Sequence, residues 1–232
     1  MNLYKLLIIA ILLIPSLTFG AVEDFTTYTE TDSAGHLTVT STKATIASGN
    51  DNNIYNLFKD FGADYFNALD IDFTIRLTTG VTTDAIVGIA VINSATPTTE
   101  TMGGTLTSTD ISVAQYWYNT TAIWLSRGNF GGIADTTGGV LALNTDYYCT
   151  LIRSASSDTV TLEIYSDSGR TTLIDTLSVS GYGTGTKWQY MYGFMNANFG
   201  ASDTLNGFVE NMDLNAVVAR IPSTESLIMF EQ

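Results

Sequence analysis

Three aromatic residues, Tyr116, Tyr118 and Trp124, have the types and spacing needed to bind a ligand. They belong to the stretch 110–127 (DISVAQYWYNTTAIWLSR), in which two apolar runs are joined by 119–121. Side chains alternate between the two faces of a strand, so the two tyrosines share one face. Trp124 joins them if the aliphatic residues of the hairpin face the core. Three rings on an exposed sheet face would form a platform for a flat, weakly polar ligand such as a sugar ring.

The alternative is that these rings fill the core. Trp188, Tyr190 and Tyr192 form a similar one-sided row later in the chain. Large rings are common in the interior of β-sandwiches, and at least one of the two rows must be buried there.

A pair of carboxylates, Asp70 and Asp72, is the other arrangement that could do chemistry. Residues two apart on a strand are separated by about 6.6 Å. Glycosidases hold two carboxyl groups about 5 to 9 Å apart, so the spacing is permissive. The next residues on the same face are Thr74 and Arg76, with no glutamate. A solvated strand face is therefore the simpler interpretation.

The sequence lacks the residues and motifs that other common kinds of catalytic site require. The chain has one histidine, His36, and one cysteine, Cys149, and it contains neither an H-E-x-x-H nor a G-x-S-x-G motif. A zinc site rich in histidine and a Ser-His-Asp triad are therefore disfavoured. The glycine-rich segment 181–185 (GYGTG) precedes a strand pattern rather than a helix and lacks the Lys-Ser/Thr ending of a phosphate loop, which indicates a turn. We predict that the protein is not an enzyme.

No cofactor is predicted. Asp135, Asp203 and Asp213 could supply oxygen ligands to calcium, but no loop has the spacing of an EF-hand. Asn119, in the sequence Asn-Thr-Thr, matches the acceptor site for N-glycosylation.

Composition favours a single all-β domain. The chain has 232 residues, of which only 14% are charged, with 9 basic against 23 acidic side chains and a net charge of −14. Such an acidic protein would be repelled by the phosphates of nucleic acid, which argues against a nucleic-acid partner. Threonine, tyrosine and phenylalanine are frequent and proline is sparse, as is typical of strands.

The first twenty residues have the organisation of a signal peptide. Lys5 precedes an apolar run over 6–17, and small residues stand at the positions expected for cleavage before Ala21. No later run approaches a membrane span. We predict a cleaved signal peptide at 1–20 and a secreted, extracellular or cell-surface protein. The alternative for this segment is a membrane anchor, for which the apolar run is short. In such a chain a lone Cys149 cannot form an internal disulfide, and it is interpreted as a buried hydrophobe, with an intermolecular disulfide as the alternative.

Alternating runs separated by turn residues predict about a dozen strands and no long helix. The expected strands cover 24–31, 36–42, 43–47, 69–78, 85–93, the hairpin at 110–127, 140–153, 158–166, 171–178, 187–196 and 205–214, with 54–61 as a strand or a helical turn and 128–139 as a loop. We predict one domain over 21–215 and a tail or closing strand over 216–232.

Three stretches carry a resemblance to a known group of folds. They are 143–153 (LNTDYYCTLIR), 160–169 (VTLEIYSDSG) and the last strand 207–214 (GFVENMDL). In order and spacing they resemble the concanavalin A-like lectin/glucanase group, specifically the laminin G-like jelly rolls. The resemblance implies two curved antiparallel sheets and a ligand on the concave face or rim loops. The Glu-x-Asp-x-Glu strand of the group's glucanases is missing, so the resemblance favours binding over hydrolysis.

Two functions from different classes follow. The first is a secreted, non-catalytic carbohydrate-binding or adhesion module in which Tyr116, Tyr118 and Trp124 stack on a glycan. The second is a structural subunit of an extracellular filament or surface layer, with like subunits as partners and the tail at 216–232 docking on a neighbour.

Overall fold

The computed structural model describes residues 22–32, 35–49, 55–79, 85–93, 106–118, 120–128, 133–139, 141–198 and 205–214. The predicted signal peptide at 1–20 and the predicted tail at 216–232 lie outside these ranges. So do Asn119 and the side chain of Tyr118.

The described residues form strands joined by turns, with one short helix. In chain order the elements are η1 (Phe25–Thr27), β1 (Thr29–Thr31), β2 (Leu37–Val39), β3 (Lys43–Gly49), β4 (Asn56–Asp60), β5 (Leu69–Thr79), β6 (Ala85–Ile92), β7 (Ile111–Tyr118), β8 (Thr120–Arg127), β9 (Ile133–Thr136), β10 (Tyr147–Arg153), β11 (Val160–Tyr165), β12 (Leu173–Val179), β13 (Tyr190–Asn198) and β14 (Leu205–Asp213). In the described ranges, no helix has the length and apolar character needed to cross a membrane.

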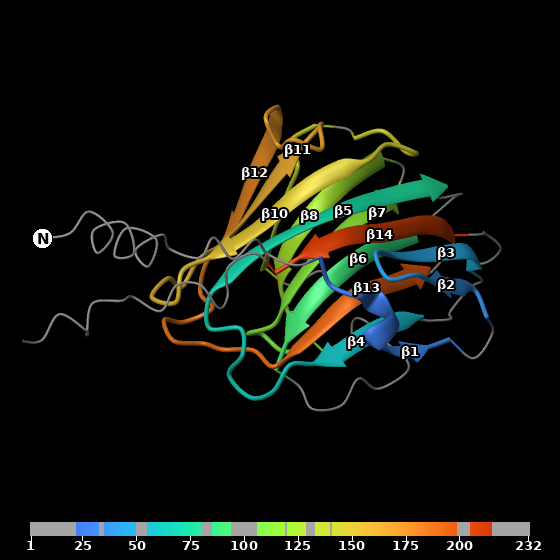
Figure 1. Ribbon diagram of the computed structural model, residues 1–232. Helices are drawn as coiled ribbons and strands as arrows, with labels where there is room; N and C mark the ends of the chain where they lie inside the picture. The colour runs from blue at the N-terminus through green and yellow to red at the C-terminus, as the bar shows by residue number, and fades with distance from the viewer. Residues whose placement is uncertain are drawn as a thin grey trace, which may run out of the picture.

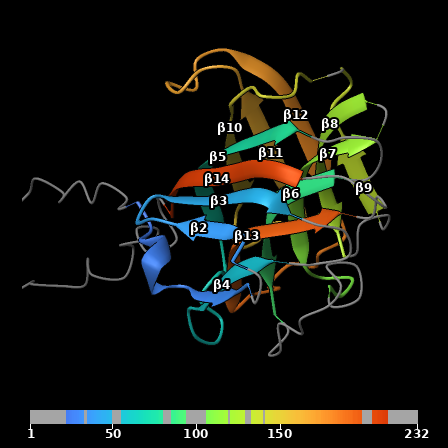
Figure 2. The same ribbon diagram turned by 90° about the vertical axis from the view of Figure 1, so that its right-hand side faces the viewer.

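Two seven-stranded sheets pack face to face (Figures 1 and 2). Sheet A has the strand order β12-β11-β10-β5-β14-β3-β2, and sheet B has the order β1-β4-β13-β6-β7-β8-β9. Neighbouring strands pair antiparallel throughout. The predicted all-β, two-sheet antiparallel sandwich is therefore confirmed.

Alternation along the strands builds the core between the sheets. The five inward residues predicted for β5 are at most 2% exposed: Leu69, Ile71, Phe73, Ile75 and Leu77. Strand β6 is buried at every position because it lies between β13 and β7 and is apolar on both faces, as its sequence predicts. Cys149 points into the same core and is a free thiol, so its interpretation as a buried hydrophobe is confirmed.

Three segments differ from the predicted elements. Residues 25–27 form a helical turn instead of a strand, because the Asp24 side chain accepts a hydrogen bond from the Thr26 N–H and ends the extended conformation. The predicted loop at 128–139 contains β9, a four-residue strand on the open edge of β8. The strand predicted over 140–153 begins only at Tyr147.

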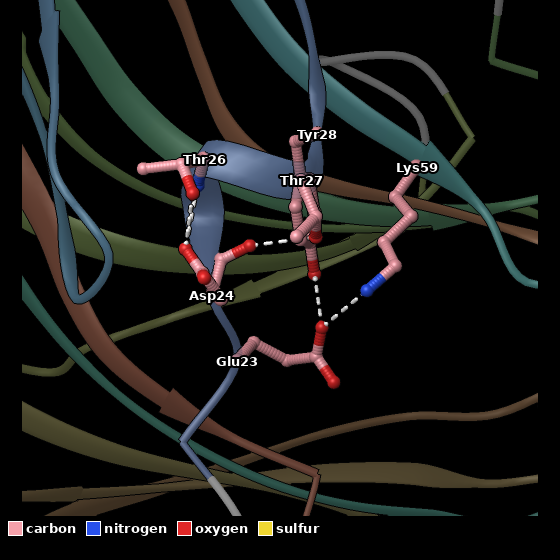
Figure 3. Close-up of polar contacts among 6 residues, drawn as sticks. All are labelled: Glu23, Asp24, Thr26, Thr27, Tyr28 and Lys59. Carbon is pink, nitrogen blue, oxygen red and sulfur yellow. Dashed lines mark hydrogen bonds and ion pairs between the residues drawn. The ribbon is translucent and has the colours of Figure 1, made fainter.

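A small polar cluster binds the start of the described chain to sheet B through hydrogen bonds and an ion pair (Figure 3). Glu23 accepts hydrogen bonds from Lys59 Nζ at 2.9 Å and from the Tyr28 hydroxyl at 3.4 Å. The same ammonium lies 4.8 Å from the ring centroid of Phe61. Burial and the neighbouring Glu23 raise the pKa of Tyr28, so that hydroxyl stays protonated. The segment before β1 is thus part of the sandwich.

The two sheets are tied together along one side by side chains. On β12, Asp175 accepts from the N–H of Gly138 at 2.9 Å, and the Ser178 N–H donates to Asp135 on β9 at 2.9 Å. Both carboxylates accept hydrogen bonds from backbone N–H groups at the place where the edge strands of sheets A and B meet (Figure 2). They limit the exposed edge that each sheet presents.

Candidate functional site

The β7–β8 hairpin carries the first candidate site. Val113, Ile123 and Leu125 point into the core between the sheets and are fully buried. Strand alternation therefore places Tyr116 and Trp124 on the outer face of sheet B. Their strands pair so that the two side chains are diagonal neighbours, and their ring centroids lie 4.0 Å apart at an interplanar angle of 50°.

Tyr116 and Trp124 are each half-buried, so part of each ring faces solvent. Burial raises the pKa of Tyr116, which keeps its hydroxyl protonated as a donor at neutral pH. Tyr118 pairs with Thr120 at the end of the hairpin, and its side chain lies outside the described part. The structure thus brings two of the three predicted ring residues together, and we call Tyr116 and Trp124 the ring pair.

The ring pair borders a second apolar cluster on the outer face of sheet B. Tyr116 packs against this cluster, whose buried members are Ile86, Ala90, Ile92, Ala114, Tyr190, Tyr192 and Met195. Phe58 and Leu106 are partly buried against it. An outer sheet face of this composition is unusual, since sandwiches commonly present polar residues there. The ring pair is the part of this face that combines two large rings with partial exposure.

The second predicted aromatic row is divided between the two faces of sheet B. Tyr190 and Tyr192 lie on the outer face, whereas Trp188 is buried in the core between the sheets. Trp188 precedes β13, forms an isolated bridge with Phe66, and donates its indole N–H to the carbonyl of Thr109 at 2.8 Å. Its contacts are set by these loops and not by the alternation of β13.

Asp110, at the entrance to β7, is a residue that the sequence did not single out. It is fully buried, and its carboxylate accepts from the N–H of Asn93 at 2.9 Å and from the N–H and hydroxyl of Thr107 at 2.7 and 2.9 Å. It therefore positions the strand that carries Tyr116. An aspartate directly before a buried strand, three residues after a threonine, is the available sequence signal.

The predicted carboxylate pair lies on sheet A and not beside the ring pair. Asp70 and Asp72 face away from the core, as expected. Asp72 Oδ1 accepts from the Thr150 hydroxyl at 2.6 Å and lies 3.3 Å from the Arg170 Nε. Asp72 is thus engaged by a hydroxyl and a guanidinium, where the sequence alone predicted a solvated face.

The candidate calcium ligands are dispersed. Asp135 lies on β9 of sheet B, Asp213 lies on β14 of sheet A, and Asp203 is outside the described residues. In the described ranges, no three histidine, cysteine, aspartate or glutamate side chains are grouped to hold a metal ion. The ring of His36 packs 5.1 Å from that of Tyr55.

The glycine-rich segment 181–185 is a turn that leads into β13. Gly181, Gly183 and Gly185 all have positive φ. The carbonyls of Gly181 and Gly183 accept hydrogen bonds from Arg127 and Arg153. The carbonyl oxygens of this loop thus bind cations of the protein itself, whereas a phosphate loop directs N–H groups at its ligand.

No known family model matches the sequence, and no curated protein is similar to it. Solved structures do match in fold. The lectin UEA-II, solved with galactose, superposes with a TM-score of 0.54 at 12% identity, covering 84% of this chain and 97% of that one. Arcelin-5, a lectin-like defense protein from Phaseolus vulgaris, gives 0.57 at 9%, covering 84% and 93%.

Two further structures broaden the comparison. The exoplasmic/lumenal domain of VIP36, in a Ca²⁺- and Man2-bound form, gives a TM-score of 0.51 at 12% identity, covering 92% of this chain and 97% of that one. A sialidase gives 0.57 at 7% identity and covers 84% of this chain, but the chain spans only 18% of that protein's length. The protein therefore has the concanavalin A-like fold, in the form seen in legume lectins and in the VIP36 domain.

Proposed function

We propose that the protein is a non-catalytic carbohydrate-binding module that binds a sugar ring on Tyr116 and Trp124. The observation that carries the proposal is the ring pair itself: two rings 4.0 Å apart and partly exposed on the outer face of sheet B. The C–H groups of a pyranose pack against an aromatic face, and aromatic contacts contribute about 1 kcal/mol each beyond the area they bury.

The fold supports this ligand class. Of the similar structures, one was solved with galactose, one is a Ca²⁺/Man2-bound form, and a third is described as lectin-like. Binding is preferred to hydrolysis because Asp72, of the predicted carboxylate pair, is held by Thr150 and Arg170 on the other sheet. A role for Tyr118 and glycosylation of Asn119 stay predictions from the sequence.

The place of action that we propose is outside the cell, where the signal peptide predicted at 1–20 would deliver the protein. N-terminal sequencing of the exported protein tests this directly. We expect the mature chain to begin at Ala21. A mature chain that still begins at Met1 would contradict the proposal.

A glycan array probed with the wild-type protein and with Trp124→Ala tests the binding function. Truncating a central aromatic contact typically costs about 2 kcal/mol or more, so we expect at least tenfold weaker binding. Phe58→Ala is the matched control, because Phe58 lies on the same sheet face next to Tyr192, while β13 and β6 separate its strand β4 from β7. Equal losses in both variants, or no glycan bound by the wild type, would refute the proposal.

A second candidate function is assembly with like subunits, and one edge strand favours it. β12 ends sheet A. Asp135 binds the N–H of Ser178 near the end of this strand, whereas Leu173 and Ile174 at its start are 52% and 41% exposed. Exposed apolar residues on an edge strand can accept an added strand. The occupant that we propose is the apolar segment 227–230 (LIMF) of a second copy.

Sedimentation of the protein with and without residues 216–232 tests this assembly. We expect concentration-dependent association that is lost on truncation and is weakened by Ile174→Lys. The corresponding control is Thr176→Lys on the same strand, which leaves the apolar pair intact. A full-length protein that stays monomeric at high concentration excludes assembly without affecting the glycan proposal.

A further inference from the structure

A pocket lies on the outer face of sheet A, on the opposite side of the sandwich from the ring pair. An open pocket of about 230 Å³ is formed there by strands β5, β10 and β14 and by the β11–β12 turn. The lining residues that matter for the chemistry are Asp72, Thr74, Tyr148, Arg170, Asn211 and Asp213.

A β-bulge directs Asp213 into the pocket. Val209 on β14 is buried in the core, so unbroken alternation would also point Asp213 inward. The pairing of β14 with β5 shifts between Glu210 and Asp213, and Asn211 adopts a left-handed conformation with φ 53°. As a result Met212 fills the core and Asp213 lies opposite Asp72. Bulges commonly re-aim a side chain in this way.

The β11–β12 turn supplies the positive charge. Arg170 also has a left-handed conformation, with φ 53°. Asp167 fixes the turn by accepting from the N–H groups of Thr171 at 3.1 Å and Thr172 at 2.7 Å. The Arg170 guanidinium thereby reaches Asp72 on β5, although β10 separates β5 from β11. The pocket is thus assembled from residues far apart in the sequence.

Two polar atoms in this pocket have unused hydrogen-bonding capacity. Asp213 Oδ1 is buried and accepts no hydrogen bond from the part of the chain that the structure describes. Arg170 Nε is also buried, and its 3.3 Å contact with Asp72 is an ion pair without hydrogen-bond geometry. Burial and the neighbouring Asp72 raise the pKa of Asp213, as expected for a carboxylate that lacks a donor. Because these two atoms are buried, a ligand hydroxyl would bond to the outer carboxylate oxygen of Asp213 and the terminal guanidinium nitrogens of Arg170, since both side chains line the pocket.

We propose that this pocket binds one small neutral polyol, in the form of a single sugar ring, independently of the ring pair. The volume is below the roughly 300 Å³ at which drug-sized pockets begin, which suits one ring rather than an oligosaccharide. Carboxylates outnumber the guanidinium and disfavour an anion. Arg170 beside Asp72 disfavours a metal ion. Tyr148 supplies an aromatic side chain against which the ring can pack.

Protein NMR during titration with D-galactose, with D-mannose and with CaCl₂ tests the site. For at least one sugar we expect amide shifts at Arg170, Asn211 and Asp213, with millimolar affinity. Asp213→Ala and Arg170→Gly should each weaken this binding at least tenfold. Glycine suits the left-handed conformation at 170, so the second variant removes the guanidinium without backbone strain. Glu163→Gln is the control, because Glu163 hydrogen-bonds Tyr165 on the same strand and does not line the pocket.

The outcomes separate this pocket from the ring pair. Pocket shifts that persist in Trp124→Ala support an independent site, even if the glycan array shows no binding to the ring pair. Absence of shifts with either sugar overturns the proposal. So do sugar shifts that are unchanged in both pocket variants, and so does a response to CaCl₂ alone, which would indicate a cation site.

Discussion

Arg153 lies over the indole ring of Trp188, with its guanidinium carbon 4.7 Å from the ring centroid. The arginine is only 2% exposed, and it donates to the carbonyls of Asn67, Thr186 and Gly183 at 2.9 to 3.0 Å. Burial lowers the pKa of Arg153, but a guanidinium stays charged at any physiological pH. One buried cation thus joins β10 to the β4–β5 and β12–β13 loops, each of which connects one sheet to the other.

Arg153→Lys should destabilise the protein by about 2 to 3 kcal/mol, because an ammonium cannot reproduce the planar fork that reaches three carbonyls. In a domain of this size that loss lowers the melting temperature by roughly 4 to 12 °C, measured by calorimetry. Arg76→Lys is the control, since Arg76 pairs with Asp146 at a partly exposed site and should lose less than about 1 kcal/mol. Equal losses of stability in the two variants would show that the buried hydrogen bonds of Arg153 contribute no more than the partly exposed pair of Arg76.

Cys149 should not react with thiol reagents in the native protein. It is fully buried, and burial raises the pKa of its thiol, so the reactive thiolate is absent at neutral pH. Labelling with a maleimide, followed by mass spectrometry, should give no adduct in buffer and one adduct per chain in denaturant. A disulfide-linked dimer on non-reducing gels of native protein would contradict this prediction.

Gly88→Ala should destabilise the protein by about 3 kcal/mol or prevent folding. A Cβ at Gly88 on the central strand β6 would overlap the carbonyl oxygen of Val113 and lie 2.9 Å from the Cα of Ala114. Both contacts are backbone atoms of a paired strand, which cannot move without breaking the sheet. Gly138→Ala is the control, because no atom lies within 4 Å of a Cβ placed there. Urea unfolding of both variants provides the comparison.

Asp213→Asn should stabilise the protein at pH 7, by less than about 1 kcal/mol because the group is partly exposed. Burial, Asp72, Asp70 and Glu23 raise the pKa of Asp213, and the opposing charge of Arg170 does not compensate. A carboxyl whose pKa is higher in the folded state costs stability above that pKa. The cost vanishes as the pH falls below the ordinary value of 3.8. The gain from Asn should therefore disappear in acid.

Asp167→Asn should change the stability in the opposite direction to Asp213→Asn, because the pKa of Asp167 is lowered and not raised. Hydrogen bonds from Thr171 and Thr172 lower the pKa of Asp167, so its ionised form stabilises the fold above the ordinary pKa of 3.8. This variant should lose stability at pH 7, and the loss should shrink as the pH falls through the lowered pKa. Thermal melts from pH 3 to 7 measure both effects. The same pH dependence in the two variants would show that the assigned causes are wrong.

The sandwich was predictable because its signal is local. The alternation of β5 and the two-faced apolar character of β6 correctly predicted an inward face and a central position. The outward placement of Tyr116 and Trp124 followed from the same rule once the aliphatic residues of their hairpin were assigned to the core. Short elements such as β9 were missed because they form through pairing with β8 and not through their own pattern.

The pocket on sheet A could not be predicted from the sequence. Asp213 points outward only because the bulge at Asn211 breaks the alternation of β14, and Arg170 reaches Asp72 from a turn about a hundred residues away in the chain. Neither effect has a reliable local signature. The period-two rule assigned Asp72 to a solvated face, and only the tertiary structure shows its partners Thr150 and Arg170.

Strand β14 lies between β5 and β3 in sheet A, although it is the last of the described strands in chain order. During synthesis, one edge of β5 and one edge of β3 stay unpaired until residues 205–213 have been made. A nascent chain that lacks them has a gap in the middle of a sheet and has no Val209 or Met212 in the core. The sandwich is therefore completed only once residues 205–213 have been made, and until then the chain depends on protection of those edges from other chains.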